Sequence, residues 1–440
     1  MSAPCDHPSV NPCELAGDGV GEPRPLALWA RVVFSVLVGV SVSSTILLLG
    51  LLLHGGGGAF AVFYAAATDV RHGGLPYQIA SGPALNQVFP YLPWVAFAVL
   101  PLTYLPYPTA LLCWITVSGA LVLVWTRVLA QGFGWTRRWP LLVGVALSSV
   151  LWRCLLTGQI DAFALGLETV ALLSAMRNRP VVSGACAVAA ALLKPQVLWC
   201  LPVVLFIALR SERRGSPFAW GGLACAVLLL GIPAVVSFQL LPAWVRLVPH
   251  FASSVATIQP DLAGLPGLVR FAPASWNLRP GLSDPVTLAV VGLGLGVAGW
   301  LLRQAGRSPA RALLSRETRL AWTVLLPFGV WVLVSPYSHT NDMLVLIPLL
   351  VLALGTDGRE IRRPEAILVL AALVILPEFF LLVEGSNPIG PRSLSSVAVL
   401  ALVSFAWSRS PWRLRPGFGA VPRPLARQPT APPAPPPERP

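Results

Sequence analysis

The sequence predicts an all-α, polytopic membrane protein, and its composition is the first observation that does so. Hydrophobic residues make up 55% of the 440 residues, charged residues only 11%, and the mean hydropathy is +0.72. Soluble proteins carry about a quarter charged residues. The composition therefore excludes a cytosolic enzyme, a disordered scaffold and a DNA-binding factor.

The second observation is a series of apolar segments. The first runs without a charge from Val32 to Leu53, about 33 Å of helix, which is enough to cross the hydrocarbon core. No small-residue cleavage site follows it, so we expect an uncleaved anchor. The further segments bring the prediction to about 12 transmembrane helices: 108–126, 139–156, 160–176, 181–193, 196–209, 219–241, 286–302, 320–335, 343–355, 366–383 and 392–408.

The third observation is the distribution of arginines, which sets the orientation. The segment 92–107 is short and contains Pro101 and Pro106, so we interpret it as an interfacial or re-entrant helix of the first outer loop. With a cytoplasmic N-terminus, 24 arginines then fall on the inner side and 5 on the outer side, as the positive-inside rule requires. Counting 92–107 as a full crossing destroys this bias. The net charge of +13 thus reflects topology and contact with membrane lipids, and no nucleic-acid partner is expected.

This orientation divides the chain into three regions. A cytoplasmic tail covers 1–28, and the membrane domain covers 29–408 with outer loops 54–107, 242–285 and 335–342. The Pro- and Arg-rich tail 409–440 is too poor in apolar residues to pack, and we expect it to be disordered in the cytoplasm. The seven cysteines have no disulfide or metal-ligand spacing, so neither a metal site nor a cofactor is predicted.

Polar side chains gather on the predicted outer side of the membrane. Long loops are often tolerated insertions, but this concentration favours the outer face as the working face. It includes four of the five histidines and four aspartates: His54, His72, His250, His339, Asp69, Asp261, Asp284 and Asp342.

Lys194 is the most informative residue, because it is the single lysine among 31 basic residues. It lies between two apolar segments, where a charge is costly and marks a pathway or a ligand site. Pro195 then breaks the helix beside it. We favour an anionic partner such as a lipid phosphate, and expect Lys194→Met to abolish activity without unfolding the protein. The alternative is a lysine that extends to the membrane surface.

A second polar cluster surrounds the turn Gly158-Gln159-Ile160-Asp161, which we place between two helices at the outer surface. Asp161 and Glu168 are seven residues apart and share a helix face. Arg153 lies two turns earlier on the preceding helix. An Arg153–Asp161 pair that ties a hairpin and a direct role in the site remain equally open.

Nothing in the sequence indicates a nucleotide-binding domain. There is no GxGxxG after a strand, no P-loop and no DxD pair, and no non-membrane stretch much exceeds about 40 residues, whereas such domains need well over 100. An enzyme of this architecture must receive its activated substrate through the bilayer as a lipid.

Several stretches between about residues 55 and 355 share their order and spacing with one family. They include AFAVFYAAATDVRHGGLPYQ, FPYLPWVAFAVLPLTYLP, LLTGQIDAFALGL, SGACAVAAALLKPQVLWCLPVVLF, DLAGLPGLVRF and LVSPYSHTNDMLVLIPLL. Together they resemble the polyprenol-phosphate-mannose-dependent α-mannosyltransferases of actinobacterial type, in the GT-C superfamily.

The resemblance implies a GT-C-like fold in the bacterial plasma membrane, with its site open to the extracytoplasmic side. It implies inverting transfer of mannose or another hexose from a polyprenyl-phosphate sugar to a glycolipid or glycan acceptor. It places four residues at the donor phosphate or sugar: Lys194, His339, Gln159 and Tyr337. Further residues then surround the substrate: Asp161, Arg153, His72, Tyr91, Trp94, Arg270 and Asp342. For Tyr91 and Trp94, an aromatic belt at the membrane interface is the alternative.

The sequence departs from the family at the catalytic base. The family carries an Asp-Phe pair where this chain has Ala59-Phe60. The nearest carboxylate is Asp69, ten residues on and about 80° round the helix. Asp69 then acts as the base, with His72 beside it, or the acceptor supplies its own base, or catalysis is lost. A transporter or flippase for lipid-linked sugars, and an inactive partner in envelope assembly, are therefore the alternative functions.

Overall fold

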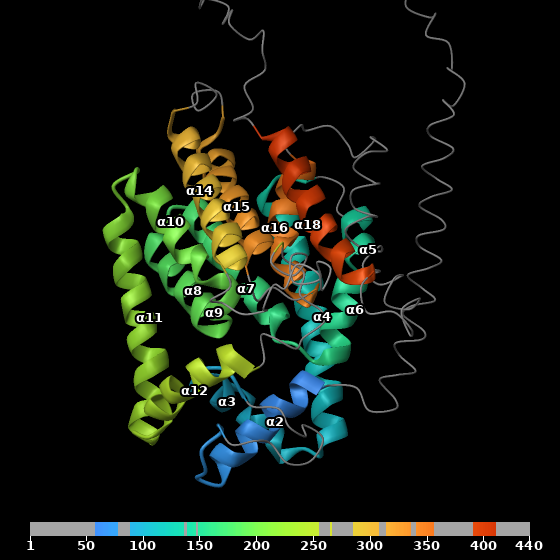
Figure 1. Cartoon of the computed structure of the whole chain (residues 1–440), viewed down its shortest axis with the longest axis vertical. Helices are drawn as coiled ribbons and strands as arrows, with labels where there is room; N and C mark the ends of the chain where they lie inside the picture. The colour runs from blue at the N-terminus through green and yellow to red at the C-terminus, as the bar shows by residue number, and fades with distance from the viewer. Residues whose placement is uncertain are drawn as a thin grey trace, which may run out of the picture.

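All regular structure in the described residues of the computed structural model is helical (Figure 1). By length and composition, four of these helices can cross a membrane: Tyr107–Gly132, Gly215–Val236, Leu288–Ala305 and Arg316–Val334. The predicted spans 32–53 and 366–383 lie outside the described residues, so the count of about 12 spans stays a prediction. The structure describes residues 58–77, 89–135, 139–146, 148–254, 265, 285–307, 314–335, 340–355 and 390–410.

Helix α7 (Asp161–Met176) lies at the centre of the bundle. Thirteen of its 16 residues are buried, as expected for a helix that is apolar on all sides and packed on all sides. Its neighbours are α4 (Tyr107–Gly132), α8 (Pro180–Leu193), α10 (Cys200–Arg210) and α15 (Arg316–Val334).

Helices α8 and α11 (Gly215–Val236) pack backbone against backbone. A Cβ atom at Gly184 would overlap the Phe218 carbonyl, and one at Gly221 would overlap the Val181 carbonyl. Small residues at such contacts let membrane helices approach closely. Further along α11, beyond this contact, large apolar side chains that include Val227, Leu228 and Ile232 are exposed and suited to lipid.

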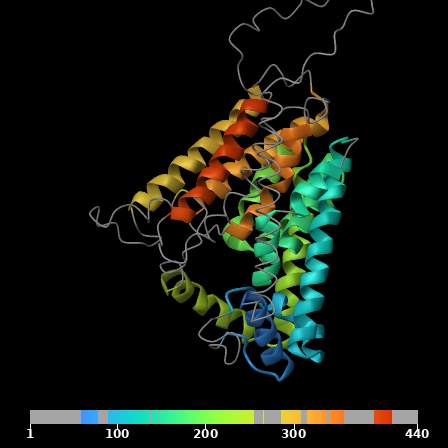
Figure 2. The same ribbon diagram turned by 90° about the vertical axis from the view of Figure 1, so that its right-hand side faces the viewer.

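A second layer of helices covers α15 and the η5 segment (Thr340–Leu346). In Figure 2, α14 (Pro285–Arg307) and α18 (Gly390–Arg409) run side by side, and the Trp300 and Trp407 rings lie 5.5 Å apart between them. Helix α16 (Ile347–Gly355) packs between α15 and α18.

A cap of short helices closes the lower end of the molecule in Figure 1. It consists of α2 (Gly58–Arg71), α3 (Pro93–Val99), η2 (Leu100–Tyr104) and α12 (Leu240–Ser254). The Trp244 indole donates to the Pro90 carbonyl (3.1 Å), and the Arg71 guanidinium donates to the Thr103 carbonyl (2.8 Å). Segment 93–104 is helical but too short to cross a bilayer, as the interfacial interpretation of 92–107 requires.

One arginine ties three elements together at the other end of the bundle. The Arg316 guanidinium donates to Glu212 Oε2 from Nε (2.9 Å) and Nη2 (2.6 Å), and from Nη1 to the Met176 carbonyl (2.9 Å). Glu212 lies in the turn between α10 and α11, and Met176 ends α7. The last carbonyls of α7 thus find a donor, and the central helix is held at its C-terminal end.

Candidate functional site around Lys194

Lys194 stands at a break between two helices that the following proline creates. Helix α8 ends at Leu193, and Lys194 adopts φ −139° and ψ 72°, a non-helical conformation that a residue before proline favours. Helix α9 (Pro195–Leu198) then begins, and the Trp331 indole of α15 fixes it by donating to the Val197 carbonyl (2.8 Å). The sequence interpretation of Pro195 as a helix breaker is confirmed.

The turn before α7 is as tight as predicted but is not at the surface. Gly158 ends α6 (Ser149–Thr157) with φ +69°, in the left-handed region where glycine is favoured, and the Gln159 N–H donates to the Cys154 carbonyl (2.9 Å). A Cβ atom at Gly158 would lie 2.5 Å from the Phe60 Cβ. Helix α2 therefore covers the turn through Phe60, and the Trp114 indole donates to the Gly158 carbonyl (3.0 Å).

The Lys194 ammonium is bound by two carboxylates. Its Nζ donates to Asp161 Oδ1 at 2.6 Å and to Asp342 Oδ1 of η5. The lysine is 1% exposed and both aspartates are fully buried. Because burying a charge is costly unless it is paired and hydrogen-bonded, the three groups stabilise one another in the protein interior. We call Lys194, Asp161 and Asp342 the ion cluster.

The ion cluster shows which groups pair with the Lys194 ammonium. The predicted anionic partner was a ligand such as a lipid phosphate, whereas the partners that the structure gives Lys194 are carboxylates of the chain itself. The alternative of a lysine extending to the membrane surface is wrong, because the side chain is buried. An ammonium has three donors, and within the described residues the carboxylates take two of them. Contact with a lipid phosphate stays a prediction.

Two further side chains lie within range of the ion cluster's charges. Burial raises the pKa of Tyr91, the Lys194 cation lowers it, and Asp161 and Asp342 raise it. The Cys154 thiol is buried and lies 3.8 Å from the Gln159 carbonyl. Cys154 was not predicted as a site residue from the sequence. Its position one helical turn before the Gly158 turn could have indicated it. Gln159 itself is partly buried in that turn.

The structure does not bring Asp69 into the ion cluster. Asp69 lies nine residues after Phe60 on α2, about 13.5 Å further along the axis and on the opposite face. Burial raises the pKa of the Asp69 carboxyl, and the charge of His72 lowers it. The charges of the ion cluster affect the pKa of Tyr91 but are not among the causes of the Asp69 shift. His72 is exposed, and its Nδ1 donates to the Thr68 carbonyl (2.9 Å).

The remaining predicted residues are spread around the cap and the bundle. The indole N–H of Trp94 on α3 is buried without a hydrogen-bond partner in the described part of the chain. Arg153 on α6 is partly buried, and Asp161 is paired with Lys194. Glu168 shares the buried face of α7 with Asp161, and neither of its oxygens has a partner among the described residues. Tyr337, His339 and Arg270 lie outside the described residues.

A comparison with known protein families identifies the chain. The sequence profile of glycosyltransferase family 87 matches residues 89–336, which is more than half of the chain. The chain belongs to glycosyltransferase family 87. The matched range contains Asp161 and Lys194, and it ends before Asp342. No curated protein matches the sequence.

Membership of family 87 makes the chain a glycosyltransferase, and its long apolar helices indicate that this enzyme is membrane-bound. Within the described residues, no group of three or more His, Cys, Asp or Glu side chains is arranged to hold a metal ion. At the ion cluster, the described residues of the family 87 enzyme bring together a buried ammonium and two carboxylates.

The geometry predicts that the ion cluster is stabilising only as a unit. Lys194→Met leaves two buried carboxylates without their cation and should lower the free energy of unfolding by about 3–5 kcal/mol, contrary to the sequence-based expectation of an intact fold. The triple variant Lys194→Met, Asp161→Asn, Asp342→Asn removes all three charges and should recover most of the loss. Thermal unfolding of the purified proteins in detergent measures both effects. A Lys194→Met protein as stable as the wild type would contradict the ion cluster.

Proposed function

We propose that this family 87 enzyme transfers mannose or another hexose, with inversion, from a polyprenyl-phosphate sugar on the extracytoplasmic face to a glycolipid or glycan acceptor. Two features support the proposal. The chain is a glycosyltransferase with membrane helices, and a buried ammonium lies near the capped end of the bundle. A donor that arrives as a lipid satisfies both.

The observation that carries the proposal is the position of Lys194 in the ion cluster. Two N–H groups of its ammonium hold carboxylates, no further partner is found among the described residues, and we assign the third N–H to a phosphate oxygen of the donor. When the sugar–phosphate bond breaks, negative charge grows on the departing phosphate. A direct N–H donor from Lys194 would stabilise that charge, whereas Asp161 and Asp342 leave the ion cluster with a net charge of −1 when both are ionised and therefore contribute the direction of the ammonium and not positive charge. Asp161 and Asp342 act in this scheme as positioning residues.

Asp69 is the proposed general base. In an inverting displacement the acceptor oxygen attacks from the side opposite the leaving phosphate, so the base and the phosphate-binding cation belong on opposite sides of the sugar. The separation of Asp69 from the ion cluster is compatible with this requirement. Burial raises the pKa of Asp69 above that of a free aspartate, which makes its carboxylate a stronger proton acceptor.

Transfer itself is the first test. Purified protein incubated with radiolabelled polyprenyl-phosphate mannose and a glycolipid extract should form a labelled product, and Asp69→Asn should slow its formation by about 10²–10⁴-fold because the base is lost. Glu317→Gln, an exposed carboxylate at the start of α15, serves as the matched control and should keep full activity. Movement of the labelled lipid across liposomes without any product would instead favour a flippase.

The acid limb of the pH profile provides an independent test of Asp69. Activity should fall as the pH drops through the Asp69 pKa, which burial has raised, because the protonated carboxyl cannot accept a proton. His72→Gln removes the charge that lowers this pKa, so the acid limb of kcat/KM should move to higher pH. An acid limb that stays in place or moves to lower pH in His72→Gln would separate His72 from the base.

A further inference from the structure

Four exposed arginines lie at the end of the bundle opposite the cap, and none of them pairs with a carboxylate among the residues that the structure describes. Two lie in the turn between α7 and α8, and two at the turn between α10 and α11. We call them the arginine face: Arg177, Arg179, Arg210 and Arg213. The acid within this second turn, Glu212, is already shared by other arginines.

Arg316 holds the two halves of the arginine face together. It donates to the Met176 carbonyl (2.9 Å), one residue before Arg177, and to Glu212 Oε2 (2.6 Å), one residue before Arg213. Helices α8, α10 and α11 pack against one another on this flank of the bundle (Figure 1). Helices α8 and α11 begin at the two turns without a side-chain cap, which adds the partial positive charge of two helix N-termini. Positive charge is therefore concentrated here and fixed in place.

Arg213 ends α10 in a backbone conformation that favours glycine. Its φ is +62°, and the Arg214 N–H donates to the Leu209 carbonyl (2.9 Å) as in other left-handed helix ends. The other described residues with positive φ are glycines and Asn178, which tolerate this conformation, whereas the Cβ atom of an arginine does not. The exposed Arg213 guanidinium makes no ion pair with a described residue that offsets the strain. A role outside the chain accounts for an arginine at this position.

Exposed apolar side chains follow directly on the arginine face. Val181 of α8 is 52% exposed, Ile207 of α10 is 44% exposed, and Trp220 of α11 is 67% exposed. Ile207 lies about one helical turn from Arg210. Arginines beside exposed aliphatic side chains and a tryptophan are typical of the boundary between lipid headgroups and acyl chains. A soluble acidic partner would leave these apolar side chains in water.

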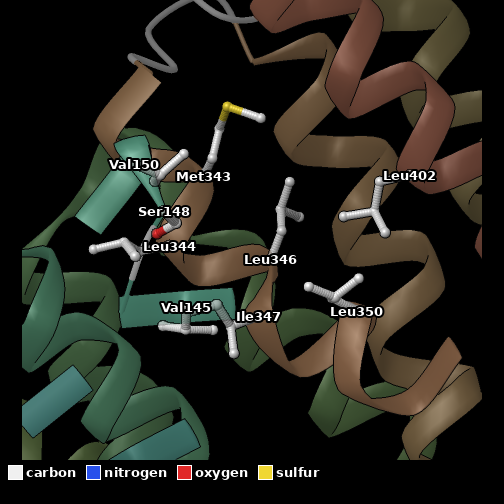
Figure 3. Close-up of a pocket in the computed structure, with 9 residues that line it drawn as sticks. All are labelled: Val145, Ser148, Val150, Met343, Leu344, Leu346, Ile347, Leu350 and Leu402. Atoms are coloured by element: carbon white, nitrogen blue, oxygen red, sulfur yellow. The ribbon is translucent and has the colours of Figure 1, made fainter. Parts of the chain in front are cut away.

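The acyl chains of a lipid at this boundary belong on the outer surface of the bundle. The aliphatic cavity in Figure 3 lies between α5 (Trp139–Ala146), α6, η5, α16 and α18. Its volume of about 40 Å³ is too small for an acyl chain. The exposed sides of α8, α10 and α11 provide the apolar surface instead.

We propose that the arginine face binds the phosphates of anionic phospholipids in the leaflet at this end of the bundle, with their acyl chains along α8, α10 and α11. A guanidinium binds a phosphate through paired N–H groups, and two turns with two arginines each offer places for two phosphates. The site is separate from the ion cluster and does not depend on the proposed function. The competing ligands are a free phosphate ion and an acidic protein segment.

Lipid binding to the full-length protein in a zwitterionic detergent tests the proposal. The probes are phosphatidylglycerol and phosphatidylcholine that carry the same fluorescent label on one acyl chain, and fluorescence anisotropy measures their affinities. Phosphatidylglycerol should bind at least about tenfold more tightly, because each arginine near an anionic headgroup contributes about fivefold in affinity. An excess of inorganic phosphate should not displace it relative to sodium chloride of equal ionic strength, since the ion lacks acyl chains.

Three variants locate the site. The double variants Arg177→Gln with Arg179→Gln, and Arg210→Gln with Arg213→Gln, should each weaken phosphatidylglycerol binding by about 25-fold, at about fivefold per arginine. Arg213→Gly should weaken it by about fivefold and raise the midpoint of thermal unfolding, because glycine adopts this backbone conformation without strain. The matched control, Arg303→Gln with Arg307→Gln on α14, removes two exposed charges and should change binding by less than about threefold.

Four results would overturn the proposal. The two lipids could bind equally well, inorganic phosphate could displace the lipid, the α14 control could lose as much affinity as the double variants, or the loss could be confined to one turn. The third result would mean that the arginines attract lipid by general charge alone. Only variants that elute from size exclusion like the wild type are compared, and Arg213→Gly keeps the test open if a double variant misfolds.

Discussion

The architecture of the site depends on one constraint, which is that an ammonium buried among membrane helices must be surrounded by negative charge. Lys194, Asp161 and Asp342 meet this constraint from three separate elements, 33 and 148 residues apart along the chain. Their pairing fixes the start of α7, the break between α8 and α9, and the η5 segment relative to one another. Local features place the charged residues: Pro195 ends α8 beside Lys194, and Gly158 starts the turn before α7. Phe60 and Trp114 cover that turn.

The sequence predicted the individual helices and turns better than the contacts between them. Helical character, the break at Lys194, the Gly158 turn and the short helix within 92–107 follow from hydropathy, proline and glycine, which act locally. Lys194, Asp161 and Asp342 were each recognised as candidate site residues, because charges in apolar segments stand out. Their mutual pairing was not predicted, since it depends on how η5 packs against α7. The burial of the turn was missed for the same reason: Phe60 is one aromatic residue among many until its packing is known.

The ion cluster can be related to the reaction class of the family. Glycosyltransferase family 87 gives the reaction class, and the proposed donor gives the ion cluster a ligand. A cation that is already held by two carboxylates is less attractive to an anion than a free one, but it is fixed in direction. The proposed site therefore relies on the fixed orientation of the Lys194 ammonium, with the base provided from the cap of short helices by Asp69.

Labelling of the single lysine tests the central claim most directly. Because the chain contains one lysine, an amine-reactive ester modifies only Lys194 and the N-terminal amine, and mass spectrometry of the intact protein separates the two. The ion cluster predicts that Lys194 of the folded protein in detergent stays unmodified until the protein is denatured. Modification of Lys194 in the folded protein at the rate of an exposed amine would contradict the buried ion cluster and the site built on it.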